Sequence, residues 1–134
     1  NLDLQDVLAI ERLDYREASA QVYAHTPCYV PWYFTLITCE GYVRGCCQCR
    51  GVLGKLDEQP FRKIWTSKAY EEYRRSCRDI PQNGMYSLPG CECDNCNYVA
   101  KNAVFHSLLT LNGSSALGAG RTGILKRMLR FKDV

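Results

Sequence analysis

The chain has 134 residues, of which 46% are hydrophobic, and this length provides one small domain with a core of modest size. Its net charge of +3 is too small and too scattered to indicate a nucleic-acid partner. No apolar signal segment begins the chain and no apolar run is long enough to span a bilayer, so we expect a cytoplasmic protein that does not enter a membrane.

Residues 1–24 are the first expected element, an N-terminal helix. Apolar side chains recur there at helical intervals among charged and polar residues: Leu2, Leu4, Val7, Leu8 and Ile10. Such a stripe needs a surface to pack on, either in this domain or in a neighbouring one. His25 follows the helix, and we expect it to make an ordinary loop hydrogen bond rather than to bind a metal.

Residues 32–45 have the composition of a β-hairpin. Aromatic and β-branched residues fill positions 33–37 and 42–43, with Gly41 between them. Glycine suits a tight hairpin turn because the turn asks for a positive φ. Such a hairpin would carry Cys28 near its entry and Cys46 at its exit, so that they become neighbours across paired strands, with Cys39 farther away near the tip.

The middle of the chain predicts helices. After a glycine-punctuated link at residues 51–56, Asp57 and Pro60 indicate a helix start with a capping carboxylate. A buried aromatic face then runs through Arg75, with a break at Thr66-Ser67, and its members are Phe61, Ile64, Trp65, Tyr70 and Tyr73. The Arg and Lys residues between them are expected to form a solvated face. Residues 80–84 and 89–90 predict a loop.

Residues 99–134 predict further helices and a basic tail. Apolar positions from Val99 to Leu111 indicate a helix, on which His106 is expected to be structural. The glycine pattern at residues 118–123 resembles a dinucleotide-binding turn, but a helix rather than a strand precedes it. The segment at residues 124–132 is basic and amphipathic, and we expect it to pack on its own domain.

Nine cysteines are many for this length, and most of them gather at two places. The first group holds Cys28, Cys39, Cys46, Cys47 and Cys49, and the second holds Cys91, Cys93 and Cys96. Thiolates separated by two residues can face one metal centre, because the turn between them points its amides at the sulfurs. In a reducing compartment clustered cysteines are more often metal ligands than disulfides. The sequence therefore predicts a metal or cluster site.

These residues resemble a known family. Cys28, twelve residues, Gly41, four residues and Cys46 are similar to the first half of the SPASM domain, the C-terminal auxiliary-cluster module of many radical S-adenosylmethionine enzymes. Residues 54–56 and 61–67, with Tyr70 and Arg74, look like the family's segment between ligands, and Cys93-Asp94-Asn95-Cys96 looks like its closing knuckle. The resemblance covers about residues 28–98.

The resemblance implies an α+β fold, with a small β-hairpin and a cysteine knuckle around a metal cluster, flanked by helices. It divides the chain into a helix or linker at 1–24, the cluster-binding domain at 25–98 and C-terminal helices with a tail at 99–134. No cysteine follows Cys96, so the single-cluster form is implied, with one [4Fe–4S] cluster held by Cys28, Cys46, Cys93 and Cys96. The remaining cysteines are expected non-ligands, of which Cys47, Cys49 and Cys91 are the nearest substitutes for an assigned ligand.

The catalytic motif of radical S-adenosylmethionine enzymes, three cysteines spaced by three and then two residues, does not occur in this chain. S-adenosylmethionine would therefore act only through a catalytic barrel in the same polypeptide or in a separate one. We assign no catalytic residue to this chain, which the resemblance implies to be part of a radical S-adenosylmethionine oxidoreductase. The implied role is electron relay or structural and substrate positioning, and family substrates are often peptides or proteins.

An alternative from another class is a zinc-binding interaction module. Cys46-Cys47-Gln48-Cys49 and Cys93-Asp94-Asn95-Cys96 would form two knuckles around one tetrahedral zinc. This alternative gives no reason for Cys28 or for the hairpin at Gly41. A third alternative, an extracellular domain held by disulfides, needs an oxidising compartment.

Overall fold

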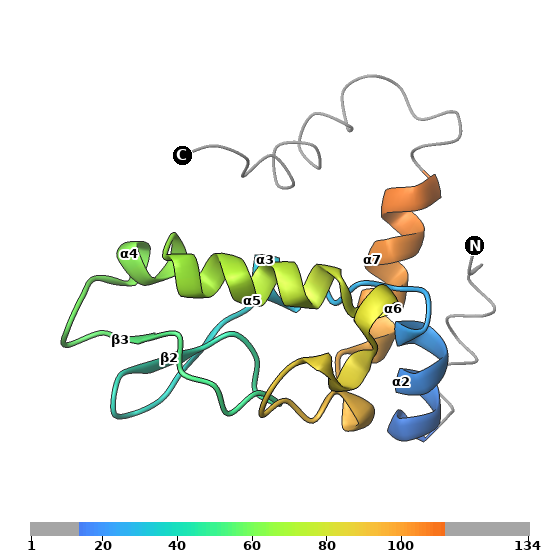
Figure 1. Cartoon of the computed structure of the whole chain (residues 1–134), viewed down its shortest axis with the longest axis horizontal. Coiled ribbons are helices and arrows are strands. Elements are labelled where there is room, and N and C mark those ends of the chain that lie inside the picture. Colours follow the sequence, from blue (N-terminus) through green and yellow to red (C-terminus); the bar gives the residue numbers. More distant parts are fainter. Residues whose placement is uncertain (1–13, 112–134) are drawn as a thin grey trace.

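The computed structural model describes residues 14–111 as short helices and a small antiparallel sheet, which lies at one end of the molecule (Figure 1). The elements, in order, are α2 (Tyr15–Tyr23), α3 (Val30–Tyr33), β1 (Leu36–Ile37), β2 (Tyr42–Arg44), β3 (Gly54–Lys55), α4 (Phe61–Trp65), α5 (Lys68–Arg78), α6 (Ile80–Asn83), η1 (Met85–Ser87), η2 (Cys93–Asn95) and α7 (Val99–Leu111). This mixture agrees with the expected α+β class. The stripe at residues 2–10, the glycine pattern and the basic tail lie outside the described residues.

The expected hairpin is present. Strands β1 and β2 pair antiparallel, with Leu36 opposite Arg44 and Ile37 opposite Val43, and Gly41 in the turn has φ 81°. The first strand is shorter than predicted, because residues 30–33 form α3 instead. Pro31 stands in the first turn of that helix, where its missing N–H and fixed φ are tolerated. The aromatic residues that predicted a strand here pack instead on helix α7, where the ring of Tyr33 stacks on Phe105.

Two glycines let helices approach this sheet closely. Strand β3 pairs with the far side of β2, and a Cβ on Gly54 would come within 2.8 Å of the Ile64 side chain. A Cβ on Gly45 would overlap the ring of Tyr73. The chain leaving β2 therefore runs directly against α5 before it reaches Cys46.

Helices α4 and α5 confirm the predicted helical segment and its break. Ser67 caps α5, and its side chain accepts a hydrogen bond from the Tyr70 amide at 3.2 Å. The predicted capping role of Asp57 is wrong: Pro60 is the N-cap of α4, and the Asp57 carboxylate pairs instead with Lys55 at 2.6 Å.

Arg74 departs from the expected solvated face of α5. Its guanidinium lies 4.3 Å from the ring centroids of both Trp65 and Tyr70. It also donates to the carbonyl oxygens of Trp65, at 2.9 Å, and Pro31, at 3.3 Å. This planar cation therefore ties α5 to α4 and α3 through aromatic stacking and charge-assisted hydrogen bonds.

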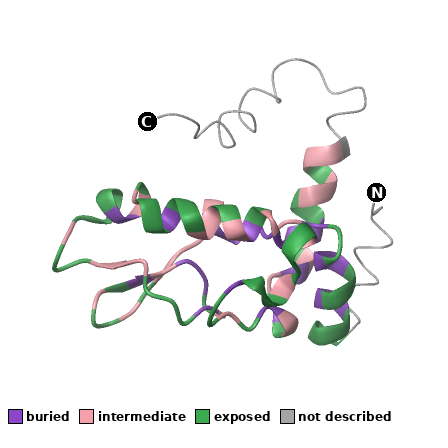
Figure 2. Cartoon of the chain, viewed as in Figure 1, coloured by how far each residue is buried: buried purple, intermediate pink, exposed green. Residues whose placement is uncertain are grey.

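The core has two parts, visible as buried residues on the inner faces of the elements in Figure 2. The smaller cluster holds Val43, Ile64 and Tyr70 between the sheet and helices α4 and α5. The larger cluster lies where α2 packs on η2 and α7, and it contains most of the buried cysteines. Among the described residues, no helix is long and apolar enough to cross a membrane.

Candidate metal centre

The four cysteines named as ligands come from three places in the fold. Cys28 lies in the link between α2 and α3, Cys46 lies just beyond β2, and Cys93 and Cys96 lie at the start and just past the end of η2. Their exposed fractions are 7%, 5%, 8% and 4%, and all four are free thiols in the larger core cluster. Residues that are far apart in sequence thus bring sulfur to one dry region.

Burial makes these thiols hard to ionise without a compensating positive charge. It raises the pKa of Cys46 to about 12, and burial together with the charges of Cys28 and Cys96 raises the pKa of Cys93 to about 12. Burial also raises the pKa of Cys96. All of these thiols belong to the larger core cluster. A bound cation would favour their thiolate forms together.

Cys28 differs from the other three. A hydrogen bond from the Cys77 side chain, which outweighs the effect of burial, lowers the pKa of the Cys28 thiol. The Cys28 amide also donates to the Cys77 carbonyl at 3.0 Å. Cys77, fully buried in α5, is therefore part of the site's surroundings. Sequence reasoning placed it outside the cysteine groups; its only signal was its helical spacing from Tyr70 and Tyr73 on the buried face of α5.

Hydrogen-bond donors surround the candidate ligands. The Gln48 amide lies 3.5 Å from Cys46 Sγ, the Tyr23 hydroxyl lies 3.1 Å from Cys96 Sγ, and Asn102 Nδ2 lies 3.8 Å from Cys28 Sγ. The Gln48 contact is the amide-to-sulfur geometry expected just after a ligand. Donors of this kind stabilise thiolate charge and orient the sulfurs.

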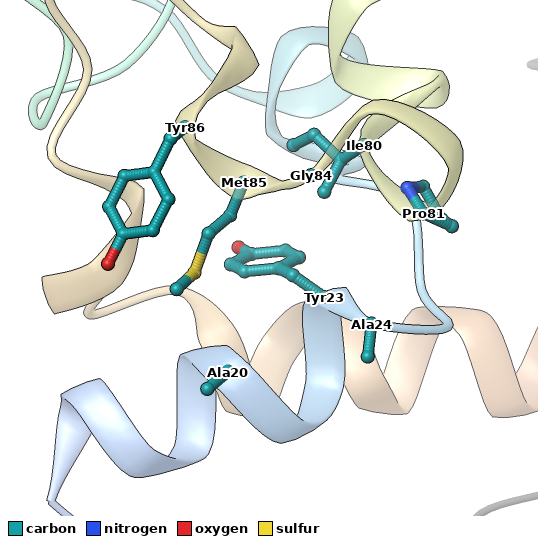
Figure 3. Close-up of a pocket in the computed structure, with 8 residues that line it drawn as sticks. All are labelled: Ala20, Tyr23, Ala24, Ile80, Pro81, Gly84, Met85 and Tyr86. Atoms are coloured by element: carbon teal, nitrogen blue, oxygen red, sulfur yellow. The ribbon is translucent and has the colours of Figure 1, made fainter.

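A pocket lies behind Tyr23. Its volume is about 270 Å³, and Figure 3 shows its lining residues, which are Ala20, Tyr23, Ala24, Ile80, Pro81, Gly84, Met85 and Tyr86. None of these side chains is charged. The Tyr23 ring thus has apolar surroundings on this side, while its hydroxyl reaches the buried thiols.

Two cysteines that we expected to be non-ligands are bonded to each other. Cys49 and Cys91 form a disulfide across an isolated antiparallel bridge. Backbone hydrogen bonds flank the bridge, from Arg50 N to Gly90 O and from Glu92 N to Gln48 O, each at 2.9 Å. The interpretation of clustered cysteines as metal ligands did not anticipate this bond. While it is formed, Cys49 cannot complete the zinc knuckle with Cys46.

The remaining predicted non-ligands and histidines lie at the periphery. Cys39 and Cys47 are exposed, with Cys39 in the hairpin turn as predicted. His25 is exposed in the link after α2, and His106 Nδ1 lies 3.0 Å from the Tyr29 hydroxyl. Within residues 14–111, no group of three or more His, Cys, Asp or Glu side chains is arranged so that it could hold a metal ion. The described residues therefore do not show a cluster-binding knuckle with its ligands already arranged around a metal position.

The donor set nevertheless has the chemistry that an iron–sulfur cluster takes: four buried free thiols in one core cluster with polar donors around them. These features define a cysteine-rich domain of the cluster-binding class. Residues 28–97 match the model of the SPASM family, described as an iron-sulfur cluster-binding domain. The match covers more than half of the chain, which therefore belongs to the SPASM family. No curated protein and no solved structure gives a match.

Proposed function

We propose that this domain binds one [4Fe–4S] cluster through Cys28, Cys46, Cys93 and Cys96 and serves as the auxiliary module of a radical S-adenosylmethionine enzyme. The observation that carries the proposal is the burial of these four free thiols in one core cluster inside the segment that matches the family. Cysteine thiolates are the usual protein ligands of such clusters.

The chain's own residues supply the environment of the site. The four thiolates would hold the cluster from three separate segments, so binding joins α2, β2 and η2 into one unit. Burial excludes water, and the donors at Gln48, Tyr23 and Asn102 would compensate the charge of the sulfurs. The bound cluster would supply one-electron transfer. With all irons bound by thiolates, electron relay or structural positioning is favoured over substrate binding.

The partner in this proposal is a radical S-adenosylmethionine barrel, in the same polypeptide or in a separate one. The barrel would bind S-adenosylmethionine, and the substrate class proposed is a peptide or protein. We place the module in the cytoplasm, where reducing conditions keep the four free cysteines available as ligands and where a disulfide such as Cys49–Cys91 is uncommon. These assignments rest on the family resemblance.

Anaerobic reconstitution of the full chain with iron and sulfide tests the proposal. We expect a brown protein that contains the iron and sulfide of one cluster, and loss of this content in each of Cys28→Ala, Cys46→Ala, Cys93→Ala and Cys96→Ala. Cys39→Ala, at an exposed position, is the matched control and should keep its iron. Full iron retention by Cys28→Ala, or a colourless protein that binds zinc stoichiometrically, would overturn the assignment.

A further inference from the structure

A buried series of hydrogen bonds connects helix α7 to the candidate ligands. Asn102 in α7 is 0% exposed and Tyr23 in α2 is 2% exposed. Asn102 Nδ2 lies 2.7 Å from the Tyr23 hydroxyl oxygen, which in turn lies 3.1 Å from Cys96 Sγ. The same amide nitrogen lies 3.8 Å from Cys28 Sγ. Two residues thus contact sulfurs from two different segments.

The donor and acceptor roles in this series of hydrogen bonds are set at the Tyr29 end. The Tyr29 backbone N–H can only donate, and it donates to Asn102 Oδ1 at 2.8 Å. The Asn102 amide group therefore turns its two N–H donors toward Tyr23 and Cys28. The Tyr23 oxygen accepts from Asn102, and a Cys96 thiolate bound to a cluster would carry no proton, so the phenolic proton of Tyr23 would then donate to Cys96 Sγ. The hydrogen bonds therefore run from Tyr29 through Asn102 and Tyr23 and end on the sulfurs of Cys28 and Cys96.

We propose that Tyr23 and Asn102 are positioning residues that raise the reduction potential of the cluster. The inference rests on the proposed function and goes beyond it by naming the groups that would tune the site. Reduction adds negative charge to the cluster and its sulfurs, and a hydrogen bond donated to a sulfur stabilises that charge. In a dry site, linked donors polarise one another, so the Asn102 bond strengthens the donation from Tyr23.

The test is a redox titration of the full, reconstituted chain, followed by electron paramagnetic resonance of the reduced cluster. Tyr23→Phe removes only the hydroxyl. We expect it to keep its iron and to shift the one-electron equilibrium threefold to tenfold against reduction, which lowers the midpoint potential by about 30–60 mV, since tenfold corresponds to 59 mV for one electron. Asn102→Leu should lower the potential in the same direction.

Tyr70→Phe is the matched control. Tyr70 is a fully buried tyrosine in the other core cluster, with Val43 and Ile64, so its variant should leave the potential unchanged. If the two variants do not hold a cluster, 3-fluorotyrosine placed at position 23 keeps the ring and provides a stronger donor, and the potential should rise. An iron-loaded Tyr23→Phe protein, or fluorotyrosine protein, with the wild-type potential would overturn this inference alone. Wild-type chain that binds no iron would overturn the proposed function and this inference with it.

Discussion

Cys46 and Cys49 lie three residues apart and have different partners. Cys46 is a free buried thiol whose sulfur accepts from the Gln48 amide at 3.5 Å, whereas Cys49 is bonded to Cys91. Both cysteines belong to the larger core cluster, but only around Cys49 does paired backbone bring a second sulfur, that of Cys91, into bonding position. Local backbone partners therefore decide the role of each cysteine.

The double variant Cys49→Ser, Cys91→Ser should keep its iron, because neither residue is an assigned ligand. It should lose the stabilisation that a cross-link over a sequence separation of 42 residues provides, about 4 kcal/mol when the unfolded chain is otherwise free. Iron analysis and urea unfolding of the metal-free protein, with Cys39→Ser as the control, measure the two effects. Iron loss without unfolding would place one of the pair among the ligands.

Cys77→Val should also keep its iron. The change preserves much of the volume in the core but removes the hydrogen bond to Cys28, so we expect a loss of about 1 kcal/mol of stability and a higher pKa for the Cys28 thiol in the metal-free protein. The rate of thiol alkylation against pH, in mild denaturant if needed for access, reports that pKa. A variant that folds but loses its iron would contradict the assignment of Cys77 as a non-ligand.

At the scale of elements, Gly45 controls how α5 meets the end of β2. The ring of Tyr73 occupies the space that a side chain at position 45 would need. We expect Gly45→Ala to destabilise the fold by about 1–3 kcal/mol through overpacking next to Cys46. Gly51→Ala is the control, since a Cβ there meets no atom within 4 Å. Urea unfolding of both variants decides the point, and equal stability of the two would show that Tyr73 moves aside without cost.

The sequence predicted those elements whose signals are local. Gly41 gives the hairpin turn, and Ser67 gives the break between α4 and α5, because a positive φ and a capping hydroxyl act within a few residues. Helix α3, strand β3 and the true role of Asp57 were missed, because packing against α7, pairing with β2 and the charge of Lys55 decide them. The prediction of a loop at residues 80–84 is wrong as well: residues 80–83 form α6, and Pro81 is tolerated because it stands in the first turn. In the candidate site, spacing singled out the four thiols, but the contributions of Cys77, Tyr23 and Asn102 come from tertiary contacts that no spacing displays.

At the scale of the whole molecule, the proposed site depends on long-range contacts. Helix α2 packs on η2 and α7, and the Ser19 hydroxyl accepts from the Cys96 amide at 3.3 Å, so the N-terminal and C-terminal parts of the domain meet at the thiols. Metal binding at such a place contributes directly to folding free energy.

The reconstituted and reduced chain should not cleave S-adenosylmethionine. Cleavage needs an iron with a free coordination position, and the three-cysteine motif that provides one does not occur in this sequence. Incubation with S-adenosylmethionine should yield no 5′-deoxyadenosine above a control without protein. Product in stoichiometric amount would mean that one of the four assigned thiolates is not a ligand.

The covalent bond between Cys49 and Cys91 has a consequence for a chain that has been cut. Any single break in residues 50–90 would leave two pieces, one with Cys28 and Cys46 and the other with Cys93 and Cys96, and the disulfide would hold them in one molecule. Six of the arginines and lysines where trypsin cuts are exposed within that stretch: Arg50, Arg62, Lys63, Lys68, Arg75 and Arg78. A nicked domain would therefore migrate as two fragments only after reduction, and until then it would retain every sulfur of the proposed site.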